Sequence, residues 1–235
     1  MRKIAFITDT HLDEELPVSV GVDSKENLNT IIADVLEKGI NEIVIGGDLG
    51  EPTSHEWFFR KLKSFNYKII VGNHDTFSQV QKHYNPSPQL DELYYTREDE
   101  FLKYIYLDTS SHAISELQLD WFRAQLSTKK KILLFMHHPA LSVNTVADKM
   151  YPLQNRSTII DELIKIDSEV TIFCGHYHME DVQDYKNIKQ VITPAASFQL
   201  VKDAPDIQLN GDEFGYTIIS IEKDVVSWDV VRFEK

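Results

Sequence analysis

Five short clusters of carboxylate, imidazole and amide side chains each follow an apolar run in this chain of 235 residues. The clusters are Asp9-Thr10-His11, Gly47-Asp48, Gly72-Asn73-His74-Asp75, His137-His138-Pro139 and Gly175-His176-Tyr177-His178. Oxygen and imidazole nitrogen atoms are the ligands that Mn²⁺, Fe, Zn²⁺ and Co²⁺ accept, whereas thiolates are absent from these clusters. The glycines allow the backbone to turn tightly where each strand ends. The clusters therefore predict metal chemistry.

Each cluster taken alone has a plain structural explanation. Asp9 and His11 fit a helix cap beside a surface histidine, and Gly47-Asp48 fits an ordinary turn. His137 and His138 fit packed core histidines before a proline. Five such clusters, all at the carboxyl ends of predicted strands, are hard to explain as independent accidents, because α/β sheets bind their ligands at that edge.

The ligand count suits two cations. Two aspartates, one asparagine oxygen and four imidazoles can hold two divalent ions if one aspartate bridges them. Two such ions, about 3.5–4 Å apart, clamp the attacking and leaving oxygens of an in-line displacement at phosphorus. They also lower the pKa of a bridging water and so give a hydroxide nucleophile at neutral pH.

The order of these motifs resembles the calcineurin-like metallophosphoesterase superfamily, and the match runs from Asp9 to His178. Further segments are similar to the branch that contains class III cyclic-nucleotide phosphodiesterases, although related phosphodiesterases share them. These segments are His137-His138-Pro139, Leu107-Asp108-Thr109, Gln118-Leu119-Asp120-Trp121-Phe122 and Thr193-Pro194-Ala195-Ala196.

The resemblance implies a role for each site residue. The metal ligands it implies are Asp9, His11 and His178 for the first cation, Asp48 between the two, and Asn73, His137 and His176 for the second. His74 would face the substrate, stabilise charge on the phosphoryl group and protonate the leaving oxygen. Asp75 would orient His74. His138 would either support a ligand or simply pack in the core.

One segment departs from the pattern of many relatives. The chain reads Gly47-Asp48-Leu49-Gly50-Glu51-Pro52, without the further Asp or Asp-Arg pair that often follows Gly-Asp. This departure argues against the protein Ser/Thr phosphatase branch. Lys149 and Arg156 could contact phosphate, or they could be solvated loop charges.

Alternating strands and helices must position these residues. Ile4–Ile7, Glu42–Ile45 and Lys68–Val71 read as buried strands, with a helix in each interval. Asp23 and Glu26 resemble a capping box at the start of the first helix, and Gly39 fits its end. This βαβαβ order predicts a largely parallel sheet.

The second half is richer in antiparallel strands. Tyr94–Thr96 and Leu102–Leu107 look like an antiparallel pair, and Ser115 with Gln118 begins a helix. Further elements are expected at Lys131–Met136, Ser157–Ile166 and Val170–Cys174, followed by antiparallel strands at Lys189–Thr193, Tyr216–Ile221 and Val225–Phe233. The pattern supports an α/β class. The resemblance implies a four-layer α/β/β/α sandwich of two mixed sheets, and we expect a single domain over residues 1–235.

Two stretches are long for structureless loops. Thr76–Glu92 and Leu141–Arg156 are expected to be lids, specificity elements or mobile segments. Aromatic residues near the predicted site, namely Tyr84, Tyr151, Tyr177 and Phe198, include candidates for stacking on a base.

Composition restricts the partners. The formal net charge of −13 excludes a long nucleic acid or an anionic membrane as a bulk partner. The single cysteine, Cys174, permits no intrachain disulfide, and we expect a cytoplasmic protein because no signal peptide or spanning segment is evident.

The function expected from these features is a dinuclear metal-dependent phosphoesterase. We expect Mn²⁺, Fe²⁺/Fe³⁺ or Zn²⁺ as cofactors and a small phosphodiester as substrate, with a cyclic nucleotide as the first candidate. A metal-bridging hydroxide would attack phosphorus. The alternatives are a phosphomonoesterase or phosphoprotein phosphatase with the same metals, and a non-catalytic interaction module on the same fold. A homodimer is compatible with this prediction.

Overall fold

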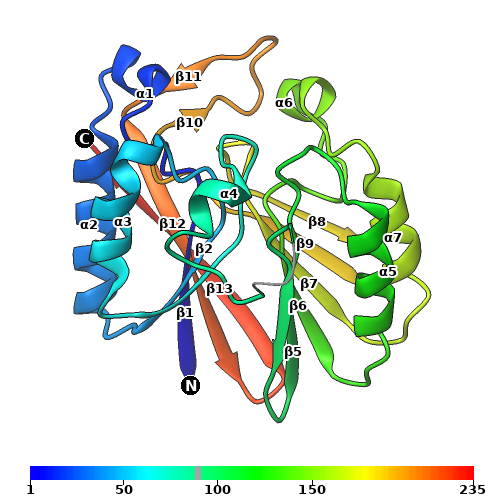
Figure 1. Cartoon of the computed structure of the whole chain (residues 1–235). Helices are drawn as coiled ribbons and strands as arrows, with labels where there is room; N and C mark the ends of the chain where they lie inside the picture. The colour runs from blue at the N-terminus through cyan, green and yellow to red at the C-terminus, as the bar shows by residue number, and fades with distance from the viewer. Residues whose placement is uncertain (88–90) are drawn as a thin grey trace.

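Two β-sheets pack face to face with helices on their outer sides (Figure 1). The computed structural model describes residues 1–87 and 91–235, so residues 88–90 of the predicted loop Thr76–Glu92 lie outside the described residues. The five-stranded sheet has the order β13-β12-β1-β2-β3, and the six-stranded sheet has the order β4-β5-β6-β7-β9-β8. A short hairpin of β10 and β11 stands apart from both.

The strands of the first sheet are β1 (Arg2–Ile7), β2 (Glu42–Ile45), β3 (Asn66–Ile69), β12 (Glu213–Glu222) and β13 (Val225–Glu234). The strands of the second sheet are β4 (Tyr95–Glu98), β5 (Leu102–Tyr106), β6 (Lys131–Phe135), β7 (Val170–Cys174), β8 (Asp181–Tyr185) and β9 (Ile188–Ile192). The hairpin consists of β10 (Gln199–Leu200) and β11 (Leu209–Asn210).

The helices are α1 (Glu15–Ser19), α2 (Ser24–Glu37), α3 (His55–Leu62), α4 (Phe77–Val80), α5 (Glu116–Gln125), α6 (Val146–Met150) and α7 (Arg156–Leu163), with a 3₁₀ turn η1 (Pro52–Ser54) before α3. The short helices α4 and α6 lie within the two segments predicted as long loops. None of the helices in the described part of the chain is both long and apolar enough to span a bilayer.

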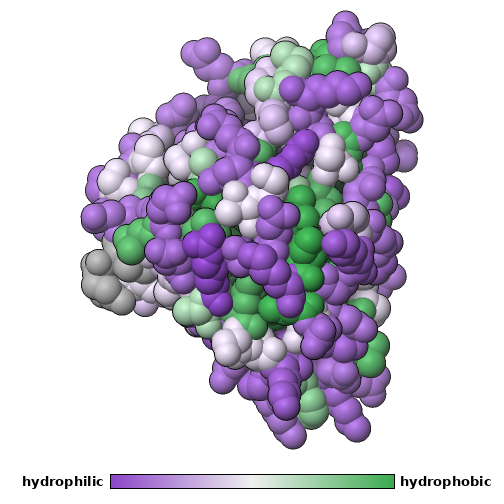
Figure 2. All heavy atoms as spheres, turned by 90° about the vertical axis from the view of Figure 1, so that its right-hand side faces the viewer, coloured by the Kyte–Doolittle hydropathy of each residue, from purple (hydrophilic) through white to green (hydrophobic). Residues whose placement is uncertain are grey.

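Side-chain alternation along β5 explains the layers. Tyr104 and Tyr106 point into the core between the two sheets, whereas Ile105 points into a second core under α5 and α7. Leu28 of α2 and Phe58 of α3 belong to the same continuous apolar cluster and cover the outer face of the first sheet (Figure 1). The order of layers is thus helix, sheet, sheet, helix, which confirms the predicted four-layer α/β/β/α sandwich. The outer face that carries α5 and α7 is largely hydrophilic (Figure 2).

Local signals in the first half are confirmed. β1, β2 and β3 are parallel neighbours, as the βαβαβ reading predicts. The Asp23 side chain accepts hydrogen bonds from the backbone N–H groups of Lys25 and Glu26 at the start of α2, and Gly39 follows its end with φ +66°. The Ser115 hydroxyl oxygen accepts a hydrogen bond from the N–H of Gln118 at the start of α5.

The second half departs from the sequence prediction. The expected antiparallel arrangement of the strand at residues 188–192 is wrong in part, because β9 pairs in parallel with β7 and antiparallel only with β8. In the first half, β3 begins and ends two residues earlier than expected. The strands β8, β10 and β11 were not predicted. β10 and β11 have two residues each, and β8 has only Asp181 buried, so none carries a clear apolar alternation.

Candidate metal centre

The predicted metal ligands meet at one edge of the molecule, just beyond the carboxyl ends of strands from both sheets. Their donor atoms form two groups. Asp9, His11 and His178 make the first group, and Asp48, His137 and His176 make the second, with the donor atoms of each group within 4.8 Å of one another. We call them cluster A and cluster B. Asp9 and His178, 169 positions apart in the sequence, thus lie side by side.

The backbone turns sharply to bring these side chains inward. Five ligand residues adopt left-handed φ angles that side chains other than glycine rarely accept. They are Asp9 (φ 56°), His11 (42°), Asp48 (53°), His176 (69°) and His178 (46°). Backbone bonds hold the first turns together, because the N–H of His11 donates to the Asp48 carbonyl oxygen at 3.0 Å. The cost of this geometry indicates a site that is held for function rather than for folding.

Two glycines leave room for the carboxylates. A Cβ at Gly72 would lie 2.1 Å from Asp48 Oδ1, and a Cβ at Gly175 would lie 2.3 Å from Asp9 Oδ2. Any side chain at these positions would displace a ligand, so the two glycines are needed for the close approach of the turns.

Asp48 stands between the two clusters. Its Oδ2 lies 3.6 Å from His11 Nε2 of cluster A and 3.2 Å from His137 Nε2 of cluster B. Its Oδ1 accepts a hydrogen bond from the backbone N–H of His74 at 2.9 Å, which fixes the carboxylate plane. The carboxylate therefore occupies the position that a ligand shared by both clusters requires.

Backbone carbonyl groups orient three of the imidazoles. His137 Nδ1 donates to the Gly46 carbonyl oxygen at 2.8 Å, and His178 Nδ1 donates to the Phe198 carbonyl oxygen at 2.9 Å. His176 Nε2 donates to the Tyr151 carbonyl oxygen, also at 2.9 Å. Because each of these nitrogens carries the proton, the other nitrogen of a neutral ring faces its cluster with a lone pair.

The donor set fits divalent cations. Asn73 Oδ1 and His137 Nε2 are buried without a hydrogen-bond partner among the described residues. A buried unpaired polar atom is costly, and an oxygen or nitrogen lone pair aimed into a carboxylate cluster is satisfied by a cation. Among the described residues, the ion-pair partners of Asp9 and Asp48 are all histidines.

Charge in the clusters keeps the carboxylates ionised and His176 neutral. Burial opposes ionisation of Asp9 and Asp48, but the neighbouring imidazoles of His178 and His137 hold the pKa of both carboxyl groups well below its usual range. Burial, with the nearby His137 ring, lowers the pKa of His176 to about 3, so this imidazole is neutral at pH 7. Anionic carboxylates and a neutral imidazole are the forms that bind metal ions. Despite burial, Asp48 and Asp9 raise the pKa of His137 to about 10, so a bound cation would take the place of the proton on that ring.

Glu14 is a site residue that the sequence did not reveal. Its Oε2 lies 2.9 Å from His11 Nδ1 and 3.0 Å from His74 Nδ1, so one carboxylate orients both rings. The hydrogen bond that the His74 ring donates to Glu14, against partial burial, raises the pKa of His74 to about 9. The only sequence signal is an acidic residue three positions after His11, and the contact depends on the left-handed turn at Asp13.

Asp75 does not take the place expected for it beside the His74 ring. Its carboxylate accepts three backbone hydrogen bonds, from the N–H groups of Asp48, Leu49 and Gly72, at 2.8–2.9 Å. It therefore ties the turn after β2 to the turn after β3, and the partner of the His74 ring is Glu14. A sequence neighbour of His74 was expected, whereas the fold supplies a residue 60 positions away.

The remaining candidates have structural surroundings. His138 is buried between Thr109 Oγ1 and His112 Nδ1, and its ring centroid lies 4.1 Å from that of His176. It therefore packs in the core and also supports a ligand. Arg156 forms an ion pair with Asp148, and neither Arg156 nor Lys149 is among the described residues that line the cavity at the metal centre.

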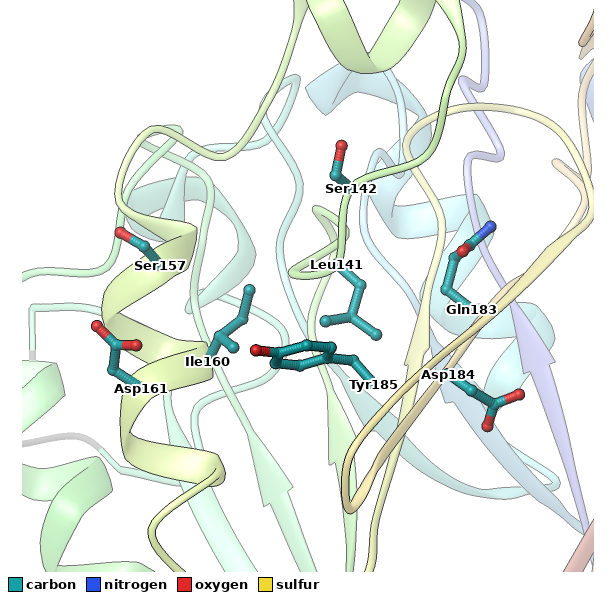
Figure 3. A pocket seen from close by; sticks show the side chains of 8 residues that line it. All are labelled: Leu141, Ser142, Ser157, Ile160, Asp161, Gln183, Asp184 and Tyr185. Carbon is teal, nitrogen blue, oxygen red and sulfur yellow. The ribbon is translucent and has the colours of Figure 1, made fainter.

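A cavity of about 300 Å³ opens over the clusters. Its floor includes His11, Asp48, Asn73, His74, His176 and His178. Of the two predicted loops, Leu141–Arg156 contributes Tyr151 to the lining of this cavity. The lining includes no described residue of Thr76–Glu92. A second hollow, of about 340 Å³ between α7 and β8, contains none of the predicted ligands (Figure 3).

Comparisons with known proteins agree with this geometry. A family model described as calcineurin-like phosphoesterase matches residues 2–180. The chain is 26% identical over 207 residues to a probable cyclic nucleotide phosphodiesterase of Fibrobacter succinogenes, covering 84% of this chain and 81% of that one. It is also 26% identical to the glycerophosphodiester phosphodiesterase GpdQ of Enterobacter lignolyticus, covering 84% and 78%.

Solved structures support the fold. A dimetal phosphatase from Danio rerio superposes with a TM-score of 0.66 at 12% identity, covering 99% of this chain and 98% of that one. GAP50 from Plasmodium superposes with a TM-score of 0.67 at 12% identity, covering 98% and 84%. At 12% identity, the structural similarity supports the fold alone, and this fold agrees with the predicted sandwich.

Proposed function

Because the chain belongs to the calcineurin-like phosphoesterase family and is a phosphoric ester hydrolase, we propose that it hydrolyses a small phosphodiester with the help of two divalent cations. Cluster A with Asp48 would hold one cation, and cluster B with Asn73 would hold the other. The observation that carries the proposal is the position of Asp48 Oδ2 between histidines of both clusters. Mn²⁺, Fe²⁺/Fe³⁺ and Zn²⁺ suit this set of oxygen and imidazole ligands.

The cations, when bound, supply Lewis acidity that activates water and stabilises charge on the phosphoryl oxygens. The chain supplies position and protons. His74, with a pKa raised to about 9, is cationic at neutral pH and lines the cavity beside the clusters. It can stabilise a phosphoryl oxygen and give the proton at one ring nitrogen to the leaving alcohol while Glu14 holds the other.

The diester preference rests on the phosphodiesterase names of the relatives and on the absence of arginine and lysine from the described lining of the cavity. A phosphomonoester carries one more negative charge than a diester and gains more from such cations. A cyclic nucleotide remains the first candidate substrate. A phosphomonoesterase and a non-catalytic module on this fold are the competing outcomes.

The test combines metal content and substrate choice. The purified chain, loaded with Mn²⁺ or Zn²⁺, is expected to hold two ions and to cleave bis-p-nitrophenyl phosphate faster than p-nitrophenyl phosphate. Asn73→Ala should lose activity and one ion. Asn66→Ala should lose neither, because Asn66 is an exposed asparagine at the start of β3, the strand that precedes Asn73. Faster cleavage of the monoester would favour the phosphomonoesterase, and neither binding nor cleavage would favour the module.

We also propose that the chain works as one domain, because Phe198 lies beyond the matched residues 2–180 and still orients His178. A cytoplasmic location and a homodimer stay predictions. Cell fractionation and gel filtration test them.

A further inference from the structure

An apolar wall stands beside the metal clusters. It is built mainly by the β10–β11 hairpin and the residue before it, and two other segments complete it. The apolar side chains are Leu200, Ile207 and Leu209 from the hairpin, Phe198 before it, Leu16 of α1 and Tyr151 after α6. The hairpin projects over the edge of the sandwich where the strands end (Figure 1). The cavity therefore has a polar floor and an apolar side.

The register of the hairpin explains which side chains face the cavity. Leu200 pairs with Leu209, and Gln199 pairs with Asn210. Cross-strand partners point to the same face, so the two leucines lie together, toward the metal clusters. Gln199 points the other way, where its Nε2 donates to the Ala195 carbonyl oxygen at 2.8 Å.

The hairpin is tied to the metal ligands. The N–H of Leu200 donates to the His178 carbonyl oxygen at 2.7 Å, and the Phe198 ring centroid lies 4.4 Å from that of His178. At the far end, a Cβ at Gly211 would lie 2.7 Å from the Val20 carbonyl oxygen, so the chain after β11 lies close against the end of α1. The wall is thus held in place relative to the clusters, which lowers the entropy cost of binding.

The wall has the chemistry of a binding surface for an uncharged group. No lysine or arginine occurs among the described residues that line the cavity, and Lys202 of the hairpin pairs with Asp181 outside it. Leu16 and Ile207 keep 47% and 37% of their surface exposed at the cavity. Covering this apolar surface with an apolar ligand is favourable, whereas a second anionic group at the wall would find no lysine or arginine among the described lining residues.

On the basis of the phosphodiesterase function proposed above, we propose that the hairpin wall binds an apolar, preferably aromatic, organic group attached to the reacting phosphorus. Leu200, Ile207 and Leu209 are then specificity-determining residues, and the substrate class is a phosphoester with a single phosphate and an apolar substituent. The aromatic preference follows from Tyr151, which lines the cavity, is 49% exposed and offers an offset or edge contact to a ligand ring.

The test uses two non-hydrolysable probes that differ only in this group. Phenylphosphonate and methylphosphonate are titrated by calorimetry into the metal-loaded protein. The wild-type chain is expected to bind phenylphosphonate at least about 10-fold tighter, from the apolar area buried by the ring. In the double variant Ile207→Ser with Leu209→Ser, the ratio should fall below about 3-fold.

Val201→Ser is the matched control. Val201 belongs to the same hairpin and is 45% exposed, but it does not line the cavity. This variant should keep the wild-type ratio, and thermal melting checks that each variant is folded. Equal affinity of the wild-type chain for the two probes would overturn the proposal, as would the same loss of preference in Val201→Ser.

Failure of the proposed function gives a different result. A wild-type chain that binds both phosphonates with the expected ratio but cleaves no phosphodiester would support the wall and refute the phosphodiesterase proposal. A chain that cleaves bis-p-nitrophenyl phosphate without distinguishing the phosphonates would do the opposite. Each proposal therefore stands or falls on its own readout.

Discussion

A buried carboxylate lies near each end of β2, and the two carboxylates have different kinds of partner. At the start of the strand, Glu42 accepts hydrogen bonds from Arg2 Nε and Nη2 at 2.6 and 2.7 Å and from Arg97 Nη2 at 2.6 Å. Beyond its end, Asp48 faces only histidines among its ion-pair partners in the described chain. The first carboxylate is neutralised by the chain itself, and the second is not.

The difference separates a structural charge cluster from a functional one. A buried carboxylate with bidentate guanidinium partners needs nothing further from solvent or ligand. Two carboxylates paired only with imidazoles, an unpartnered Asn73 oxygen and an unpartnered His137 nitrogen have no permanently charged partner among the described residues. Folding alone gains little from such a cluster, so its presence points to a bound cation.

The largest expected effect on activity is at Asp48, beyond the end of β2. Asp48→Asn removes the charge of the ligand shared by both clusters, and activity on bis-p-nitrophenyl phosphate should fall at least about 1,000-fold, with loss of metal. Added Mn²⁺ should raise the melting temperature of the wild-type chain and leave that of the variant nearly unchanged, because only the wild type binds the cations tightly. A stable variant that keeps both cations and its activity would contradict the comparison.

His74→Ala should have the next largest effect. Loss of a charge-stabilising and proton-donating imidazole is expected to lower kcat about 100- to 1,000-fold, most for diesters with poor leaving groups, while both cations stay bound. His83→Ala is the control, because that imidazole stacks on Phe59 away from the metal clusters. Loss of a cation in His74→Ala would show that His74 is a ligand instead.

Substitution of Glu42, at the start of β2, should change stability rather than activity. Glu42→Gln leaves Arg2 and Arg97 without their shared counter-charge, and we expect the free energy of unfolding to fall by about 2–3 kcal/mol, since both guanidinium groups are partly exposed. Denaturant titration measures this loss. Activity and metal content well below the melting temperature should be unchanged, and a large loss of either would erase the distinction between the two ends.

The smallest expected effect is a pH dependence. Burial opposes ionisation of Glu42, but Arg2 and Arg97 hold the pKa of its carboxyl group below the usual value. Its contribution to stability is therefore complete above the unfolded pKa of about 4.3 and is lost as the pH falls through the folded pKa. In chelator, the stability difference between wild type and Glu42→Gln should shrink below about pH 4. A constant difference down to pH 2 would contradict this assignment.

Motifs local in sequence were predictable, and contacts made across the fold were not. Ligand types next to glycines at strand ends indicated where Asp48 and His176 would lie, because parallel strands bring their carboxyl ends together. Glu14 was not predicted, because its contact with His74 depends on a left-handed turn at Asp13 that no residue pattern indicates. The apolar wall was not predicted either, because β10 and β11 have two residues each and are too short to show an apolar alternation.

The hydrogen bond from Ser197 Oγ to the Asp9 carbonyl oxygen joins residues 188 positions apart. Beside it, the N–H of Ala196 donates to the Thr8 carbonyl oxygen, and β1 itself pairs with β12. A ribosome must therefore release most of the chain before the turn that carries Asp9 can close. The order of synthesis thus delays the metal centre, and contacts of such long range make it slow to assemble. A nascent chain stalled before Ser197 should bind no cation pair.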